Sequence, residues 1–593
     1  MPGDFWSGEP VQYSADIHRI EALPRREQPT EVVLDLLVRQ VTARYRRQVT
    51  VCRCADYGRD CITTLRPIQA WALYEIALVG GLLGPIGVGH GKTMLDILAS
   101  LAVPGITTSL LLIPAKLVTQ FCKEYEVVRQ HFRVPGLVVH GYSFERTMYA
   151  PPMLHVLSYE RLSVETSTTF LDKLNPDLVI FDEAHKLRHY RAVRTGRVRL
   201  FMGSHRATRS LSWSGSITDS SIRDFAHLSG WALRENSPVP LEYTAIQDWA
   251  RALDAVDFPA PMGALSRFCR PGEKVRDGFH RRLVETRGVI ATSDPSVDVG
   301  LEILERPLTA IPQIVRTALR DLETHWRRPD GEEFSDALGK SRCARELACG
   351  FYYRWIFTGG ETDADILEWL SARKEWKQEL REKLKFPKPH LDSPKLCAQA
   401  ARRAHGQLSN EHGLPEWNSE TWMRWHAAKP LVNGGKPPET EPVRLHEYLA
   451  ADAAKWATEH RGIVWYDKVA FGTWVSEIGG LPMHGGGSQA GQRIDAERGD
   501  RSIVASIKSH GEGRDGLQRK FAEQLVANPP SSPTGWEQLL GRLHRIGQTA
   551  SSVRAYYYRH TEDLACHVDT ALQRALYVDS TLGTMQKLRV GFL

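Results

Sequence analysis

The stretch that decides the fold of this chain is Leu82-Leu83-Gly84-Pro85-Ile86-Gly87-Val88-Gly89-His90-Gly91-Lys92-Thr93. It begins as a short apolar run, passes through a glycine-rich turn and continues into residues 92–101, whose apolar residues recur at helical spacing. A strand, a glycine turn and a helix are the setting of a phosphate-binding loop, because glycines let backbone N–H groups converge on phosphate oxygens at the helix N-terminus. The sequence therefore predicts an α/β lobe with a nucleotide site at this turn.

The loop offers a different group to each part of a nucleoside triphosphate. Lys92 would reach the β- and γ-phosphates, and the Thr93 hydroxyl would bind Mg²⁺. Ile86 stands where the strict motif has glycine, but the Gly-x-Gly-Lys-Thr end that carries the chemistry is intact. The alternative is a glycine turn before an ordinary core helix. The residues predicted to bind ATP through this loop are Gly87, Gly89, His90, Gly91, Lys92 and Thr93.

A pair of carboxylates, Asp182-Glu183, follows the apolar run of residues 178–181. That run, like residues 110–115, is typical of a buried parallel strand. Since open α/β sheets bind ligands at the carboxyl ends of their strands, we expect Asp182 to hold Mg²⁺ and Glu183 to orient and deprotonate the attacking water. The alternative is a charged surface turn, which the preceding apolar run disfavours.

Three polar residues outside these motifs are weaker candidates. The amide of Gln69 offers both a donor and an acceptor to the edge of an adenine ring. Ser214 and Ser216 follow another strand-like piece, and their hydroxyls would couple the ATP site to a second site by hydrogen bonds. A plain helix start at Gln69 and an ordinary Ser/Gly turn are the competing interpretations.

A second alternation of apolar strands and helical segments begins near residue 461. Strands are expected at residues 461–466 and 502–507, followed by the glycine-rich segment 509–516. The next helix, residues 536–545, would carry Gln538, Arg542 and Arg545 on one face. Guanidinium groups suit a γ-phosphate because they stay charged and present fixed donors, and an arginine finger from another lobe makes hydrolysis depend on lobe closure. The competing interpretation is a solvated basic face.

Several of these motifs together resemble superfamily 2 helicases of the DEAD/DEAH-box type, and within them the Swi/Snf-type DNA translocases. The matching stretches are Leu65-Arg66-Pro67-Ile68-Gln69, Asp182-Glu183-Ala184-His185, Lys508-Ser509-His510-Gly511-Glu512-Gly513 and Gly541-Arg542-Leu543-His544-Arg545-Ile546-Gly547-Gln548. The last of them is a hallmark of the Swi/Snf branch. Ser214-Gly215-Ser216-Ile217 departs from the Thr-Gly-Thr-Pro usual there.

The resemblance implies two RecA-like parallel-sheet lobes, with ATP and Mg²⁺ in the cleft and DNA across both lobes. It places Asp515 near the nucleotide and assigns coupling roles to His185 and Gln538. Catalysis would then rest on Lys92, Thr93, Asp182, Glu183, Arg542 and Arg545. The domain division expected from it is a helical extension at 1–60, a first lobe at 61–225, a mainly helical insertion at 226–454 and a second lobe at 455–593.

The expected activity is ATP-dependent translocation on DNA, with backbone contacts and little sequence specificity. An RNA helicase on the same scaffold is one alternative, against which the Gly541–Gln548 signature argues. An ATP-gated DNA clamp or scaffold with little turnover is the other. The pathway, the protein partners and the question of strand separation are left open by the sequence.

The bulk composition fits this expectation without requiring it. The chain has 593 residues, 42% of them hydrophobic and 25% charged, with a net charge of +6, as in a soluble multidomain protein. The mild basicity is compatible with a polyanionic partner. The first residues have neither a basic start nor an apolar run, and no stretch is long and apolar enough to span a bilayer, so we expect a cytoplasmic protein. By analogy with the Swi/Snf-type proteins that it resembles, its compact size suggests a protein of a bacterium or of a phage-infected cell.

The only cluster among the nine cysteines is Cys52, Cys54 and Cys61. Scattered cysteines in a long chain indicate a reducing compartment rather than a disulfide framework. Structural zinc sites usually show two paired groups of ligands, and a fourth ligand is missing here. Free thiols are therefore the expectation, with zinc as the less favoured alternative.

Overall fold

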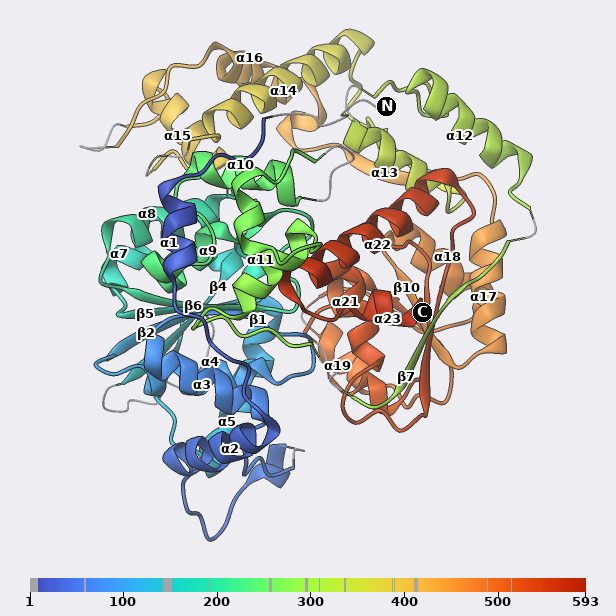
Figure 1. Ribbon diagram of the computed structural model, residues 1–593. Helices are drawn as coiled ribbons and strands as arrows, with labels where there is room; N and C mark the ends of the chain where they lie inside the picture. The colour runs from blue at the N-terminus through green and yellow to red at the C-terminus, as the bar shows by residue number, and fades with distance from the viewer. Residues whose placement is uncertain are drawn as a thin grey trace, which may run out of the picture.

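The computed structural model describes residues 9–57, 60–141, 152–190, 192–254, 259–293, 297–308, 310–334, 337–386, 388, 390–409, 414–487, 489–513 and 515–592. The chain is an α/β protein built on two six-stranded parallel sheets, one on each side of Figure 1. This confirms the expected parallel-sheet lobes. Within the residues given above, no helix combines the length and the apolar character needed to cross a membrane.

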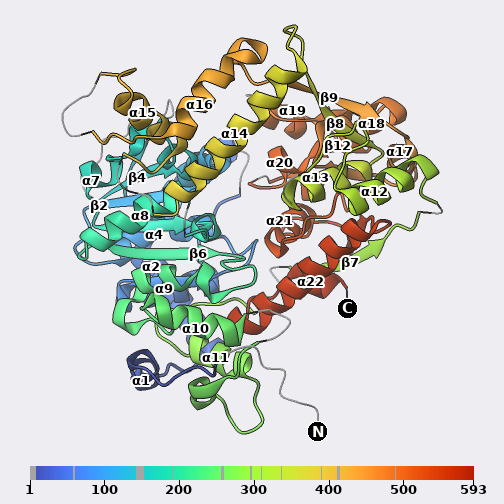
Figure 2. The same ribbon diagram turned by 90° about the horizontal axis from the view of Figure 1, so that it is seen from above.

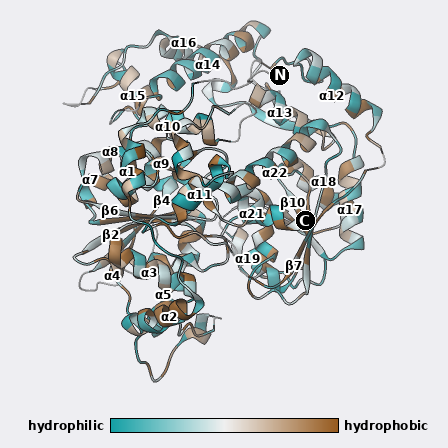
Figure 3. Cartoon of the chain, viewed as in Figure 1, coloured by the Kyte–Doolittle hydropathy of each residue, from teal (hydrophilic) through white to brown (hydrophobic). Residues whose placement is uncertain are grey.

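The first sheet has the strand order β1-β6-β5-β2-β4-β3, and all of its strands are parallel. Alternate side chains of one strand enter different cores: Val179 and Phe181 pack on one face, Leu178 and Ile180 on the other. Helices therefore cover both faces, which explains the continuous apolar strands, brown in Figure 3. The strands are β1 (Leu82–Pro85), β2 (Thr108–Ile113), β3 (Gly136–Val139), β4 (Met153–Ser158), β5 (Leu178–Asp182) and β6 (Arg209–Ser214).

The second sheet has the order β11-β12-β10-β13-β14-β7, again all parallel. It is also buried on both faces, since Ile463 and Trp465 of its central strand belong to one core and Val464 and Tyr466 to another. The strands are β7 (Gly300–Glu305), β10 (Gly462–Tyr466), β11 (Met483–His484), β12 (Ile503–Ser506), β13 (Glu523–Val526) and β14 (Ser552–Tyr557).

Helices surround both sheets. The N-terminal extension contributes α1 (Ala15–Ala22) and α2 (Glu31–Tyr45), the latter packed on α3. The first lobe has α3 (Pro67–Val79), α4 (Lys92–Ala102), α5 (Ala115–His131), α6 (Tyr159–Leu162), α7 (Phe170–Leu174) and α8 (Val193–Ser204). The second lobe has α17 (Tyr448–Glu459), α18 (Val469–Gly479), α19 (Ala490–Asp495), α20 (Ile507–His510), α21 (Pro533–Leu543), α22 (Glu562–Leu582) and α23 (Lys587–Gly591).

The chain between the lobes is divided differently from the predicted insertion at 226–454. Three of its helices, α9 (Ala226–Leu233), α10 (Tyr243–Leu253) and α11 (Val275–Val284), share a hydrophobic core with the first sheet. Strand β7, predicted to lie in the insertion, is instead the edge of the second sheet and pairs in parallel with β14. Tertiary packing and pairing thus join both flanks of the predicted insertion to the two sheets.

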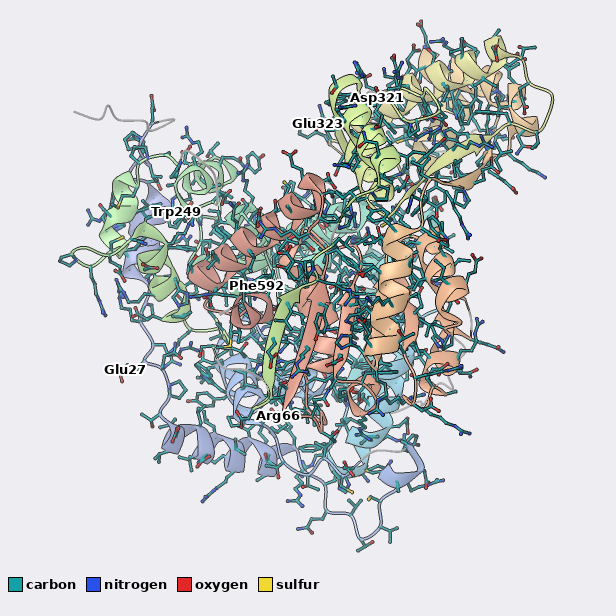
Figure 4. The ribbon with its side chains drawn as sticks, turned by 90° about the vertical axis from the view of Figure 1, so that its right-hand side faces the viewer. Glu27, Arg66, Trp249, Asp321, Glu323 and Phe592 are labelled. Carbon is teal, nitrogen blue, oxygen red and sulfur yellow. The ribbon has the colours of Figure 1, made fainter. Side chains whose placement is uncertain are left out.

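What remains between the lobes is an outer region, residues 310–445. It holds α12 (Gln313–His325), α13 (Ala337–Leu347), α14 (Asp363–Lys383), α15 (Pro394–Ala404), α16 (Glu420–Ala428) and the antiparallel pair β8 (Phe351–Ile356) and β9 (Glu439–Arg444). Helix α12, which carries Asp321 and Glu323, lies beside these outer elements in Figure 4. A buried bidentate ion pair fastens the region to the first lobe, with Arg197 Nε 2.6 Å from Asp392 Oδ2 and Arg197 Nη2 2.9 Å from Asp392 Oδ1.

Helix α22 runs from the second lobe to the first (Figure 2), with its first turns beside α13 of the outer region. It leaves the second sheet after β14 and packs against α11 of the first lobe. Near its end, Tyr577 Oη donates to Asp254 Oδ1 at 3.4 Å, and His280 Nδ1 lies 3.3 Å from the carbonyl of Thr581. The chain after α22 thus comes to rest beside the glycine-rich loop.

Candidate functional site

The glycine-rich loop connects the C-terminal end of β1 to the N-terminus of α4. Gly89 and Gly91 adopt positive φ values of 98° and 75°, a conformation that favours glycine. A Cβ atom built on Gly91 would lie 2.5 Å from Nε2 of Gln69 and would displace that side chain from the loop. The loop therefore has the strand-turn-helix geometry that the sequence predicts.

Two side chains at the start of α3, those of Arg66 and Gln69, donate hydrogen bonds to the backbone of this loop. Gln69 Nε2 donates to the carbonyl of Gly91 at 2.9 Å, while Gln69 Oε1 accepts from Arg66 N at 2.9 Å. Arg66, labelled in Figure 4, donates from Nη1 to the carbonyl of Gly89 at 2.6 Å. The Gln69 amide, predicted to read adenine, thus makes its hydrogen bonds with backbone, although Gln69 also lines the cavity described below.

Lys92 lies between the loop and the acidic pair. Its Nζ is 3.3 Å from the carbonyl of Ile86 and 3.7 Å from Oε1 of Glu183. Only 10% of its side chain is exposed, so the charge is held inside the site rather than in solvent. The ammonium group in this position can leave the Ile86 carbonyl and the Glu183 carboxylate and bind phosphate oxygens instead.

Asp182 ends β5 and is almost completely buried. Its Oδ1 atom has no hydrogen-bond partner among the described residues. Burial and the neighbouring Glu183 raise the pKa of Asp182 to about 7. A buried carboxylate oxygen without a donor is a suitable ligand for a hard cation, and Thr93 lines the same cavity, so these two residues fit the predicted Mg²⁺ site.

Glu183 has the left-handed φ of 49°, uncommon for a residue with a side chain. Its Oε2 accepts from Ser214 Oγ at 3.1 Å and lies 3.2 Å from His185 Nδ1. Burial alone would raise the pKa of Glu183, but the Lys92 charge and the bonds from His185 and Ser214 outweigh it, so that the pKa is lowered. Two residues predicted to couple, His185 and Ser214, are therefore direct partners of the predicted base.

A third carboxylate, which the sequence analysis missed, lies behind this pair. Asp96 of α4 is buried and accepts a hydrogen bond from Trp213 Nε1 at 3.0 Å. Burial and the nearby Asp182 raise the pKa of Asp96 well above its usual range. The only signal for Asp96 in the sequence was its position, as a charged residue on the apolar face of the predicted helix 92–101.

The second lobe contributes Asp515, Gln538, Arg542 and Arg545. Helix α21 ends at Leu543, so Arg545 comes from the segment after the helix and not from the predicted shared helical face. Arg545 Nε lies 3.5 Å from Asp515 Oδ1, and Asp515 is held in turn by Gln518 Nε2 at 2.8 Å. Arg542 is buried and donates from Nε to the carbonyl of Gln538 at 2.9 Å. Burial and the adjacent Arg545 lower the pKa of Arg542 to about 9, so its guanidinium stays protonated at neutral pH.

One cavity of about 380 Å³ brings these groups together from both lobes. Its volume suits a nucleotide. The predicted residues that line it are Gln69, Gly89, Gly91, Lys92, Thr93, Asp182, Glu183, Asp515, Gln538, Arg542 and Arg545. Lining residues that the sequence analysis missed include Arg66, Glu512, Gln518 and Arg519.

The remaining predicted residues lie behind the loop. Gly87 and His90 line a second, much smaller cavity between the loop and the C-terminal segment. Ser216 lies 3.5 Å from Gln586 of that segment, measured from Oγ to Oε1. Thr584 Oγ1 donates to the carbonyl of Pro85 at 3.2 Å. The back of the nucleotide loop is thus in contact with the end of the second lobe.

Glu537 of α21 lines this second cavity and is buried against Lys587. Its carboxylate accepts a hydrogen bond from the backbone N–H of Lys587. Burial raises the pKa of Glu537 from 4.5 to about 7, and the Lys587 charge opposes this only in part. The neutral carboxyl is thus favoured in the fold. The stability it provides is complete below the unfolded-state pKa and is lost as the pH rises through the folded-state value.

We expect Glu537→Gln, which keeps the shape and stays neutral, to be more stable than the wild type at pH 8 but not at pH 4.5. The difference should reach on the order of 3 kcal/mol. Thermal unfolding of both proteins across this range measures it. Equal pH dependence of the two melting temperatures would contradict the prediction.

Comparison with known proteins adds no relative, since neither the models of known protein families nor the curated proteins include a match to this chain.

Proposed function

We propose that the chain is an ATPase with two RecA-like lobes that uses ATP hydrolysis to move along DNA, as the resemblance to Swi/Snf-type translocases implies. The observation that carries the ATPase is the cavity of about 380 Å³, where Lys92, Asp182 and Glu183 of one lobe meet Arg542 and Arg545 of the other. A phosphate loop, an acidic pair and two arginines converging from different sheets form the arrangement required for phosphoryl transfer.

In the proposed reaction Glu183 accepts the proton of the attacking water. Its lowered pKa keeps it ionised at neutral pH, and the bonds from Ser214 and His185 fix its carboxylate. Lys92 and Arg542 stabilise the negative charge on the transferred phosphoryl group from opposite lobes. Because Arg542 belongs to the second lobe, hydrolysis requires both lobes to be in place.

Asp182 and Thr93 would hold Mg²⁺. When bound, this ion supplies charge neutralisation to the β- and γ-phosphate oxygens. Burial and the nearby Asp182 and Glu183 raise the pKa of Asp96, so a cation held by Asp182 would offset the repulsion among these three carboxylates.

Ion pairs across the cleft link the relative position of the two lobes to the nucleotide site. Lys186, next to the acidic pair, donates to Glu512 Oε1 at 2.9 Å, and Lys116 Nζ lies 3.8 Å from Glu512 Oε2. Glu512 itself lines the nucleotide cavity. A shift of the second lobe would break these pairs and move Arg542 at the same time, so the position of the second lobe would control hydrolysis.

The test is ATP hydrolysis by the full chain without nucleic acid and with single-stranded DNA, duplex DNA or RNA, each at two salt concentrations. We expect strong stimulation by duplex DNA that is lost at high salt, because contacts with phosphates release counterions. Lys92→Ala serves as the blank for contaminating ATPases. Stimulation by RNA alone would replace the DNA assignment with an RNA helicase, and an unstimulated slow ATPase would favour the clamp.

A further inference from the structure

Three cysteines and one histidine gather at the edge of the first lobe, next to the part of the nucleotide cavity that is lined by Ile62 and Val128. The ligand atoms of Cys52, Cys54, Cys61 and His131 all lie within 4.8 Å of one another. The fourth member, absent from the sequence cluster, is the last residue of α5 and comes from a distant part of the chain. The objection to a metal site that the sequence raised, a missing fourth ligand, is thereby removed.

Backbone pairing fixes the position of the histidine relative to the cysteines. The segment that follows α2 runs alongside the end of α5, where Arg47 N donates to the carbonyl of His131 at 2.7 Å and Arg133 N donates to that of Tyr45 at 2.7 Å. The short turn of residues 54–57 packs against α5 as well. The four side chains therefore converge because two segments of backbone are joined, not because one loop happens to be rich in cysteine.

The histidine ring is the second observation that points to a ligand. His131 is buried, with 8% of its surface exposed. Its Nε2 atom has no hydrogen-bond partner among the described residues. A buried polar atom normally has a partner, because leaving it without one costs about 1–3 kcal/mol. An ion held between this nitrogen and the three sulfurs would provide one.

The donor set selects the class of ion. Thiolate sulfur and imidazole nitrogen in a four-ligand group are typical of zinc, whereas Mg²⁺ and Ca²⁺ prefer oxygen. The Sγ atoms of Cys52 and Cys61 are 3.3 Å apart, and both residues are free thiols in the structure. In a tetrahedral zinc site with Zn–S bonds of about 2.3 Å, neighbouring sulfurs are only slightly farther apart than this.

We propose that Cys52, Cys54, Cys61 and His131 bind one Zn²⁺ ion as a structural site. Four protein ligands complete the tetrahedral shell and leave no open position for a substrate. The ion ties the segment between α2 and α3 to the end of α5. The start of α5 carries Leu117, a wall of the nucleotide cavity, so the zinc fixes one side of the lobe that holds ATP.

The first test is the metal content of the full chain, purified under reducing conditions without added chelator, by plasma mass spectrometry. We expect one zinc per chain, and after exchange with Co²⁺ the visible absorption of a tetrahedral thiolate complex. Cys61→Ser and His131→Ala should lose the zinc, whereas Cys122→Ser, which removes another buried thiol from α5, should retain it. One zinc per chain in all of these variants would overturn the assignment.

A second test uses thiol alkylation of the wild-type protein, so its result does not depend on whether the variants fold. Cys61 and Cys566 are both exposed, so without a metal both should be alkylated quickly by iodoacetamide. We expect Cys61 to be protected until a chelator is added and Cys566 to react at once. Equal rates for the two thiols, or a disulfide between Cys52 and Cys61 under reducing conditions, would refute the zinc site. Neither readout depends on ATP hydrolysis, so the result is independent of the proposed function.

Discussion

Replacing Arg542 by alanine is expected to lower the kcat for ATP hydrolysis by about 10³-fold or more, the magnitude of losing an arginine finger. The guanidinium is buried at the cavity shared by the two lobes and remains charged despite its lowered pKa of about 9. Its removal takes away the second lobe's charge on the transferred phosphoryl group. Steady-state hydrolysis with saturating duplex DNA measures the effect.

Two variants make this experiment specific. Arg542→Lys keeps the charge but loses the planar fork of donors, so it should recover only part of the rate. Arg559→Ala, which removes a surface arginine paired with Asp569, should leave kcat unchanged. A fully active Arg542→Ala protein would exclude Arg542 from the proposed role and leave Arg545 as the second lobe's candidate for the arginine finger.

Glu183→Gln is expected to lower kcat by about 10²–10⁴-fold, the usual contribution of a general base, while ATP still binds. Glutamine keeps the shape of the side chain and its contact with Ser214, but it cannot accept a proton from water. The lowered pKa of Glu183 means that the wild-type base is already ionised well below neutral pH. Single-turnover hydrolysis together with equilibrium binding of a fluorescent ATP analogue separates the two effects.

The matched control for Glu183→Gln is Glu477→Gln, which alters an exposed carboxylate paired with Arg444 on the second lobe. Its hydrolysis rate should equal that of the wild type. If Glu183→Gln bound the ATP analogue no more tightly than Lys92→Ala, the loss would reflect a damaged site rather than a missing base. Hydrolysis at the wild-type rate would exclude Glu183 from the proposed role.

The parts of the fold that the sequence predicted are those with strong local patterns. Apolar runs located β2, β5, β10 and β12 to within a few residues, and glycines marked the turn into α4. Most of the residues predicted around the nucleotide converge because they follow the carboxyl end of a strand or lie near a helix terminus, although Gln538 lies in the middle of α21. Functional residues at such positions can be predicted from the sequence, because the local secondary structure alone determines where their Cα atoms lie.

The parts that failed depend on long-range pairing. Strand β7 is exposed along one side, and only its partner β14 identifies it as part of the second sheet. Arg545 was assigned to a helical face although α21 ends two residues earlier, where His544 leaves the helical conformation. His131 lies far from the cysteines in sequence, and no spacing rule connects them. In each case the deciding contact joins segments that a local pattern cannot relate.

Strand β7 leaves the ribosome long before the strand it pairs with. About 250 residues separate it from β14, so at roughly 5–20 residues per second β7 waits on the order of 10–50 s for its partner. The first sheet is complete by β6, before β7 is made, and Val289 pairs with Leu83 of that sheet 11 residues ahead of Gly300, the start of β7. If the first lobe has already folded, a short segment of chain attaches β7 to it until β14 is made. This attachment limits how freely the unpaired edge of β7 meets other nascent chains.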